Sequence, residues 1–153
     1  GGTTMARFET ILVPIDFSEH SQEALDTAIQ IARLFGSTIH LLHCYHIQTA
    51  GISPYGIVLP SGYYADIRDA AEKRLSDWHD KVTSEGLKVD SQLSADSPSL
   101  AINLAAEEIN ADLIVMGTRG LSGLKHAMLG SVAERVVRLA PCPVLTVKHP
   151  EAD

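Results

Sequence analysis

The sequence lacks the two most familiar nucleotide-binding patterns, because neither G-x-x-x-x-G-K-[ST] nor G-x-G-x-x-G occurs in its 153 residues. This absence argues against a P-loop kinase or a dinucleotide dehydrogenase. Cysteine is scarce, and Cys44 and Cys142 are too few for a disulfide framework, so we expect free thiols in a reduced cytoplasm. No apolar run approaches the roughly 18 residues of a membrane-spanning helix, and no membrane insertion is expected.

Basic residues are also few. The chain has 12 Lys and Arg against 19 Asp and Glu, a net charge of -7. This balance argues against non-specific binding to nucleic acid or to an anionic membrane. No Ser-His-Asp order and no paired acids stand out, so the sequence favours binding over efficient catalysis. We expect one domain over residues 5–150, with residues 1–4 left from expression and residues 151–153 as a tail.

Strand-like and helix-like segments alternate along the chain. The apolar patterns predict strands over 8–15, 38–45, 87–95, 113–116 and 143–148, with helices between them. Such alternation predicts a parallel sheet with helices on both faces. A stretch rich in glycine and proline, residues 48–62, predicts a long loop. In the helix that follows Pro98, five apolar residues are expected to face the core: Leu100, Ala101, Leu104, Ala105 and Ile109.

A glycine-rich turn stands out near the C-terminus. Gly117-Thr118-Arg119-Gly120 follows the predicted fourth strand, and Gly130-Ser131 comes nine residues later at the start of a predicted helix. Ser131 and Glu134 have the spacing of a capping box. Glycines in such a turn reach positive φ and let a ligand approach the backbone, while N–H groups at the helix start favour an anion. The turn predicts a phosphate site; a flexible turn with an ordinary cap is the alternative.

Polar residues near this turn and near the first strand are candidates for the same site. Asp16 ends the first strand, where its carboxylate can accept hydrogen bonds from ribose hydroxyls or cap the helix near Ser18. If the first and fourth strands are neighbours, Asp16 and Gly117 converge on one crevice. Arg119, Lys125 and His126 can neutralise phosphates or form a solvated loop face, and Arg119, between the first two glycines, is the strongest of the three.

A metal site is weaker as a hypothesis. Four potential ligands occur near the second strand: His40, His43, Cys44 and His46. Zinc-site spacings are absent, so we expect no metal there. Mg²⁺ held by Asp16 is the one metal that we keep in consideration.

Several motifs together resemble the universal stress protein family. They are the G-x2-G-x9-G-[ST] pattern followed by residues 132–137, the segment Ala140–Leu145, the segment Ile11–Ser18, and Ile39–His43. The resemblance covers about residues 8–148. It implies a five-stranded parallel sheet of order 3-2-1-4-5, an adenine nucleotide alpha-hydrolase-like fold. Within the family, this glycine pattern marks the branch that binds ATP.

The resemblance also implies the roles of single residues. It places the adenine against Pro14, Ile15 and the backbone of Ile39, the nucleoside against Asp16, Met116 and Gly117, and the phosphates against Gly120, Gly130, Ser131 and Val132. Family members commonly dimerise through the last strand. That strand is expected at the sheet edge, so a homodimer is predicted, with an edge covered by the C-terminal tail as the alternative.

The sequence therefore predicts a cytoplasmic, ATP-binding regulatory protein of the stress response. Nucleotide in the glycine-rich turn is expected to change a surface for an unidentified protein partner. Three alternatives stay open: a slow ATPase or ATP-cleaving enzyme that uses Asp16, a dimeric interaction protein that uses no nucleotide, and a receiver-like domain with Asp16 as phosphoacceptor. The last is weakest, because residues 14–18 offer a single acid.

Overall fold

A computed structural model describes residues 8–45, 62–119 and 129–149 of the chain. Five parallel strands form one sheet in the order β3-β2-β1-β4-β5, which confirms the predicted topology. The strands are β1 (Thr10–Pro14), β2 (Thr38–Cys44), β3 (Lys88–Ser94), β4 (Leu113–Gly117) and β5 (Val144–Val147). The central strand β1 lies between β2 and β4, so the strand order reverses there. This is the position at which sheets of this type open a crevice beyond their carboxyl ends.

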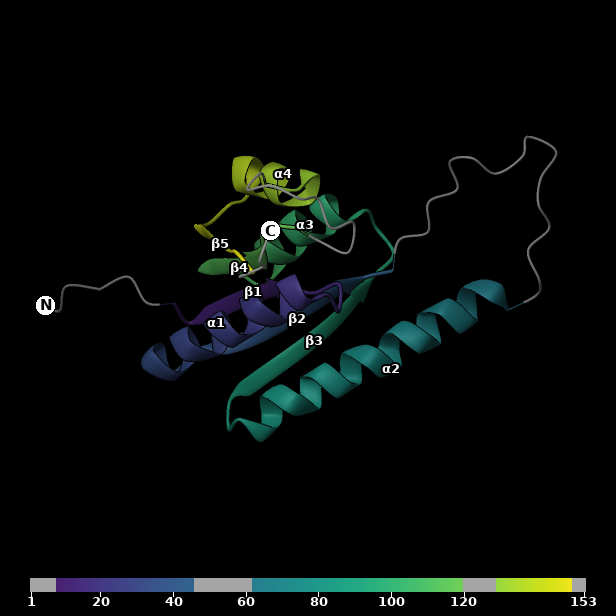
Figure 1. The fold of residues 1–153 in the computed structure, drawn as a ribbon, viewed down its shortest axis with the longest axis horizontal. Helices are drawn as coiled ribbons and strands as arrows, with labels where there is room; N and C mark the ends of the chain where they lie inside the picture. The colour runs from purple at the N-terminus through teal and green to yellow at the C-terminus, as the bar shows by residue number, and fades with distance from the viewer. Residues whose placement is uncertain (1–7, 46–61, 120–128, 150–153) are drawn as a thin grey trace, which may run out of the picture.

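Four helices connect the strands and cover both faces of the sheet (Figure 1). They are α1 (Glu19–Phe35), α2 (Tyr63–Ser84), α3 (Pro98–Glu108) and α4 (Ser131–Leu139). None of the helices in the described ranges is both long and apolar enough to cross a bilayer. Crossovers between parallel strands are right-handed, and because the strand order reverses at β1, α1 and α2 lie on one face of the sheet and α3 and α4 on the other.

The core has two halves, one on each face of the sheet. Alternate residues of β1 divide between them, because successive side chains of a strand point to opposite faces. Ile11 and Val13 pack with α1 and α2, whereas Leu12 packs with α3 and α4. Most strand residues in these clusters are fully buried, as expected for a sheet covered on both sides. Burial of this kind supplies the main favourable term in folding.

Local signals in the sequence explain where the elements begin and end. Ser18 is the N-cap of α1 and its Oγ accepts a hydrogen bond from the Ser21 N–H, while Gly36 ends the helix at φ 69°. Ser97 precedes Pro98 at the start of α3, as predicted, although the Ser97 side chain makes no capping hydrogen bond. The predicted loop over residues 48–62 lies outside the described residues, except for Gly62, the N-cap of α2.

The predicted inward face of α3 is partly wrong. Leu100 and Leu104 are exposed, and the buried face instead consists of Ala101, Ile102, Ala105 and Ala106. The helix is apolar on more than one side, so periodicity does not single out one face. The observed face has mostly small side chains, which let α3 lie close to the sheet. Ile102 is thereby placed at the carboxyl end of the central strands, where it becomes part of the site.

Candidate functional site

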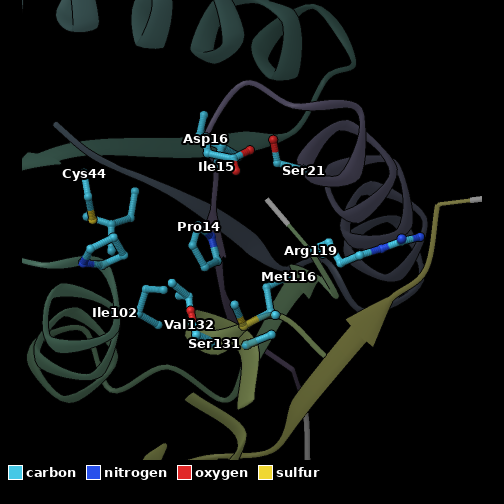
Figure 2. Close-up of a pocket in the computed structure, with 15 residues that line it drawn as sticks. Pro14, Ile15, Asp16, Ser21, Cys44, Ile102, Met116, Arg119, Ser131 and Val132 are labelled. Carbon is cyan, nitrogen blue, oxygen red and sulfur yellow. The ribbon is translucent and has the colours of Figure 1, made fainter. Parts of the chain in front are cut away.

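A cavity of about 500 Å³ opens beyond the carboxyl ends of the central strands, on the α3 and α4 side of the sheet. It is bounded by the ends of β1, β2 and β4 and by the N-terminal parts of α1, α3 and α4 (Figure 2). Its lining residues are Pro14, Ile15, Asp16, Ser21, Leu42, Cys44, Pro98, Ile102, Met116, Gly117, Arg119, Gly130, Ser131, Val132 and Ala133. Size and position are those of a small-molecule site in an open α/β sheet.

One part of the cavity is apolar. Figure 2 shows Cys44 and Ile102 on one side of Pro14, with Met116 and Val132 on another. Burial raises the pKa of the Cys44 thiol to about 11, and the negative charge of Asp96 adds to the effect. The thiol is therefore neutral at physiological pH and serves as a small apolar wall. A flat, weakly polar group such as a heterocyclic base suits these surroundings.

The start of α4 forms a more polar part of the cavity. Gly130 is the N-cap, at φ -64° and ψ 163°, and no described side chain caps the helix. The N–H groups of a helix's first turn have no acceptor within the helix, and the helix dipole makes this end attractive to anions. Ser131, which carries a hydroxyl group, lines the same part of the cavity. Together these groups can accept a phosphate or carboxylate.

The predicted capping box is wrong. Ser131 is the first residue of α4 rather than its N-cap, and the Glu134 N–H donates to the Gly130 carbonyl at 3.0 Å. The Glu134 carboxylate instead pairs with Arg138, one turn further along, at 3.5 Å. The shift of one residue matters, because Ser131 lines the cavity and makes no capping hydrogen bond to the helix.

The glycines also act differently from the prediction. Neither Gly117 nor Gly130 has positive φ. Gly130 instead lies against the preceding turn: its N–H donates to the Thr118 carbonyl at 2.6 Å, and a Cβ added to it would lie 3.3 Å from that oxygen. An added Cβ would therefore be tight at Gly130, and at Gly117 it would lie 2.8 Å from the His20 Cβ, so these two positions favour glycine through close packing and not through an unusual dihedral angle.

Asp16 lies in the turn between β1 and α1 and lines the cavity near Ser21 (Figure 2). Its Oδ1 accepts a hydrogen bond from the Ser18 N–H at 3.0 Å. The carboxylate therefore helps to shape the start of α1, which agrees with the alternative prediction that Asp16 caps this helix. Asp16 also lines the cavity. The two roles are compatible, since a carboxylate accepts several hydrogen bonds.

Most of the predicted site residues converge on this one cavity. Those that line it are Pro14, Ile15, Asp16, Met116, Gly117, Arg119, Gly130, Ser131 and Val132. Figure 2 shows the Arg119 side chain extending away from the other labelled residues. Gly120, Lys125 and His126 lie outside the described residues, as does His46.

Ile39 does not line the cavity, and its predicted place in the site is corrected here. It is the second residue of β2, pairs with Ile11 and is fully buried, so it lies near the amino end of the strand. Ligand crevices form beyond the carboxyl ends of parallel strands. The β2 residues that reach the crevice are Leu42 and Cys44.

Sequence reasoning missed several lining residues, among them Cys44 and Ile102. Cys44 was interpreted as an ordinary buried thiol, and Ile102 was hidden by the misassigned face of α3. A signal for Cys44 was available, because it is the last residue of a strand next to the switch in strand order. Within the described parts of the chain, no three His, Cys, Asp or Glu side chains gather as a metal site. His40 and His43 instead contact Gln92 Oε1 and the Ile15 carbonyl, at 3.0 Å and 2.8 Å.

A family comparison now explains this arrangement. Residues 7–148 match the model of the universal stress protein family, which covers the sheet, all four helices and the cavity. The chain belongs to the universal stress protein family. This confirms the resemblance inferred from the glycine-rich turn and the first strand.

Individual relatives agree with the assignment. This universal stress protein is 35% identical over 150 residues to the universal stress protein MJ0531 of Methanocaldococcus jannaschii, covering 95% of this chain and 85% of the relative. The solved structure of the hypothetical protein MJ0577 is similar with a TM-score of 0.82 and 27% identity, covering 95% of this chain and 99% of that one. The solved structure of a universal stress protein in complex with cAMP is similar with a TM-score of 0.68 and 26% identity, and the match covers 93% of this chain and 98% of that one.

Proposed function

We propose that the cavity binds an adenine nucleotide, with ATP as the physiological ligand, and that the protein acts as a nucleotide-dependent regulator. The observation that carries the proposal is the convergence of the uncapped start of α4, the Asp16 carboxylate and an apolar wall on one cavity. A similar structure was solved with cAMP, which contains an adenine, a ribose and a phosphate.

The proposal gives each part of the ligand a place that suits the chemistry of the cavity. The phosphates lie at the first turn of α4, with Ser131 donating a hydrogen bond and the helix dipole favouring negative charge. The ribose lies beside Asp16, whose carboxylate accepts from its hydroxyls. The adenine lies among Pro14, Cys44 and Ile102, which exclude water from its faces. Arg119 and, from the family resemblance, Gly120 are proposed as further phosphate contacts, and Asp16 would hold Mg²⁺ if the metal binds with the nucleotide.

Binding fits the cavity better than turnover does. Among the described residues that line it, Asp16 is the single carboxylate, and its Oδ1 already accepts from the Ser18 N–H. Efficient phosphoryl or acyl transfer calls for a base and a nucleophile in contact, or for a second carboxylate to hold a metal. The proposal is therefore a regulatory binding module of the stress response, with at most slow hydrolysis.

A homodimer through β5 is part of the proposal. The strand occupies the open edge of the sheet, and Leu145 within it is 38% exposed. Leu139, at the end of the preceding helix, is more than half exposed. An apolar edge strand favours pairing with a second chain. The cytoplasmic location and the identity of a protein partner stay predictions.

A ligand-dependent shift of the melting temperature tests the proposed function. ATP, ADP, AMP, cAMP and GTP are compared at millimolar concentration with wild-type protein, Ser131→Ala and the control Ser84→Ala, a substitution at an exposed helix end. A ligand at 100 times its Kd stabilises the native state by about 2.7 kcal/mol. We expect ATP to raise the melting temperature of wild-type protein. The rise should be smaller for Ser131→Ala and equal to that of wild type for Ser84→Ala. A wild-type melting temperature that no adenine nucleotide moves contradicts the proposal.

A further inference from the structure

The residue after Asp16 has a backbone conformation that its side chain disfavours. Phe17 has φ 65°, in the left-handed region, and Asn110 at φ 51° is the other described non-glycine residue with positive φ. Asparagine tolerates that region, whereas a bulky aromatic residue rarely enters it. Strained residues of this kind persist where the surrounding structure holds them, and they gather at functional sites.

The Phe17 ring is held from two neighbouring elements on the face of the sheet away from the cavity. It contacts His43 of β2 with ring centroids 4.3 Å apart, and Trp78 of α2 at 5.5 Å with the planes at 70°. The Arg74 guanidinium of α2 lies over the ring, 4.2 Å from its centroid. We call these four residues the aromatic cluster. Edge-to-face and cation–π contacts each favour this one position of the ring.

The same cluster fixes the backbone that leads into Asp16. His43 Nδ1 lies 2.8 Å from the Ile15 carbonyl, and since a carbonyl oxygen only accepts, Nδ1 carries the hydrogen. The Ile15 N–H donates to the Leu42 carbonyl at 2.8 Å. Both backbone polar groups of Ile15 are therefore bound to the end of β2. The residue before Asp16 is thus fixed by hydrogen bonds, and the residue after it by ring contacts.

The conformation of Phe17 bears directly on the Asp16 carboxylate. The turn at Phe17 brings the Ser18 N–H back to Asp16, where it donates to Oδ1 at 3.0 Å. This local hydrogen bond sets the direction of the carboxylate. If Phe17 relaxed to an ordinary extended or helical conformation, the Ser18 N–H would point elsewhere and the carboxylate would lose this orientation.

We propose that Phe17 is a positioning residue of the nucleotide site: held by His43, Trp78 and Arg74, it orients the Asp16 carboxylate toward the ribose. This inference rests on the proposed function. It assigns a role in binding to a cluster that does not line the cavity. Phe17 acts through Asp16 and makes no contact with the ligand itself.

A double-mutant cycle tests the proposal with ATP as the probe. Kd is measured for wild type, Phe17→Leu, Asp16→Ala and the double variant. We expect Phe17→Leu to weaken binding about tenfold, a coupling typical of residues in one network. In the Asp16→Ala background the same substitution should change Kd less than about twofold, because the group through which Phe17 acts is gone.

Two controls separate positioning from general loss of structure. Phe17→Tyr keeps the ring and should retain wild-type affinity. Phe35→Leu removes a ring at the far end of α1, where Phe35 contacts Phe8 at 5.3 Å, and should leave Kd unchanged. If Phe17→Leu does not fold, His43→Leu replaces it in the cycle, since it removes both the ring contact and the hydrogen bond to Ile15.

The outcomes are distinct. Wild-type protein that does not bind ATP overturns the proposed function, and this inference with it. Wild-type binding with losses that add in the double variant overturns the inference alone, because Phe17 then acts independently of Asp16. Asp16→Ala with wild-type affinity overturns it as well. Non-additive losses with rescue by tyrosine support it.

Discussion

Gly117 and His20 lie so close together that a Cβ added to Gly117 would be 2.8 Å from the His20 Cβ and 3.0 Å from the His20 carbonyl oxygen. The contact joins the end of β4 to the first turn of α1. The carbonyl oxygen is a backbone atom and the Cβ is bonded directly to the backbone. His20 is also buried, with 4% of its surface exposed, so neither atom can move away easily. Gly117 is therefore a packing requirement as well as part of the cavity wall.

Gly117→Ala should destabilise the fold. The added methyl group forces β4 and α1 apart, and overpacking of this kind costs about 1–3 kcal/mol. Gly130→Ala is the matched comparison, because its Cβ would lie 3.3 Å from the Thr118 carbonyl at an ordinary φ, and we expect a smaller loss. Urea unfolding measures both. Equal free energies of unfolding for Gly117→Ala and wild type contradict the close packing.

Alkylation in the presence and absence of ATP should distinguish the two cysteines, because Cys44 lines the cavity. Burial raises the pKa of the Cys44 thiol to about 11 and also raises that of Cys142. Since the thiolate is the reactive form, both should react slowly with iodoacetamide at neutral pH and faster as the pH rises toward 10. Cys44 lines the cavity, whereas Cys142 is partly buried, packs against the half of the core that contains α3 and α4, and does not line the cavity.

ATP should therefore protect Cys44 and leave the labelling rate of Cys142 unchanged, as measured by peptide mass analysis. Equal protection of both thiols would point to a global change in stability instead of ligand over Cys44. No protection of Cys44 at saturating ATP would remove it from the adenine pocket.

Stability should depend on pH through His43. Burial lowers the pKa of this imidazole from its ordinary value of 6.5; its hydrogen bond to Ile15 and the negative charge of Asp16 act in the opposite direction, and Arg74 lowers it further. With a folded-state pKa below the unfolded one, the unfolded chain binds more protons once the pH falls below 6.5. The free energy of unfolding therefore decreases as the pH falls from 6.5 toward the folded-state pKa of His43, and it levels off below that pKa.

His43→Asn tests this pH dependence. The asparagine amide can donate to the Ile15 carbonyl but does not titrate. Urea unfolding of both proteins between pH 7 and pH 4, a range chosen around the ordinary pKa of 6.5, should show a shallower decline for the variant. Parallel curves would mean that protonation of His43 makes no contribution to acid destabilisation.

A charge on β5 should separate the proposed dimer. Leu145→Glu places a carboxylate on an edge strand, a substitution that discourages strand pairing. Sedimentation velocity should show a dimer for wild type and a monomer for the variant. Leu104→Glu, at an exposed position on α3, is the control and should stay dimeric. A wild-type monomer at micromolar concentration contradicts the proposal.

Most of the fold could be predicted from the sequence, because local signals mark its boundaries. Ser18 and Gly36 delimit α1, Pro98 begins α3, and the predicted strands agree with those observed to within about two residues. The strand order came from the family resemblance, and the structure confirms it. The prediction for α3 failed because its buried face depends on packing between elements. The buried face of α3 follows from how closely small side chains let it approach the sheet.

The site shows the same division. Asp16, Gly117 and Ser131 could be found from the sequence because they lie at strand ends and helix starts. Ile39 was misplaced because it lies near the amino end of β2, whereas ligands bind beyond the carboxyl ends of parallel strands. Cys44, at the carboxyl end of β2, satisfies that rule. The contact of Gly117 with His20 and the ring contacts of Phe17 join distant segments, so no local pattern reveals them.

The central claim is that the start of α4 and the Asp16 turn together bind an adenine nucleotide. The most direct test is mass analysis of nucleotide released by denaturing the purified protein, followed by calorimetric titration of the emptied protein with ATP. The variant Gly130→Ala/Ser131→Ala is measured beside wild type. The account predicts ATP in the wild-type protein, or its rebinding after removal, and a strong loss of both in the variant. A wild-type protein that releases no nucleotide and takes up no ATP would contradict it.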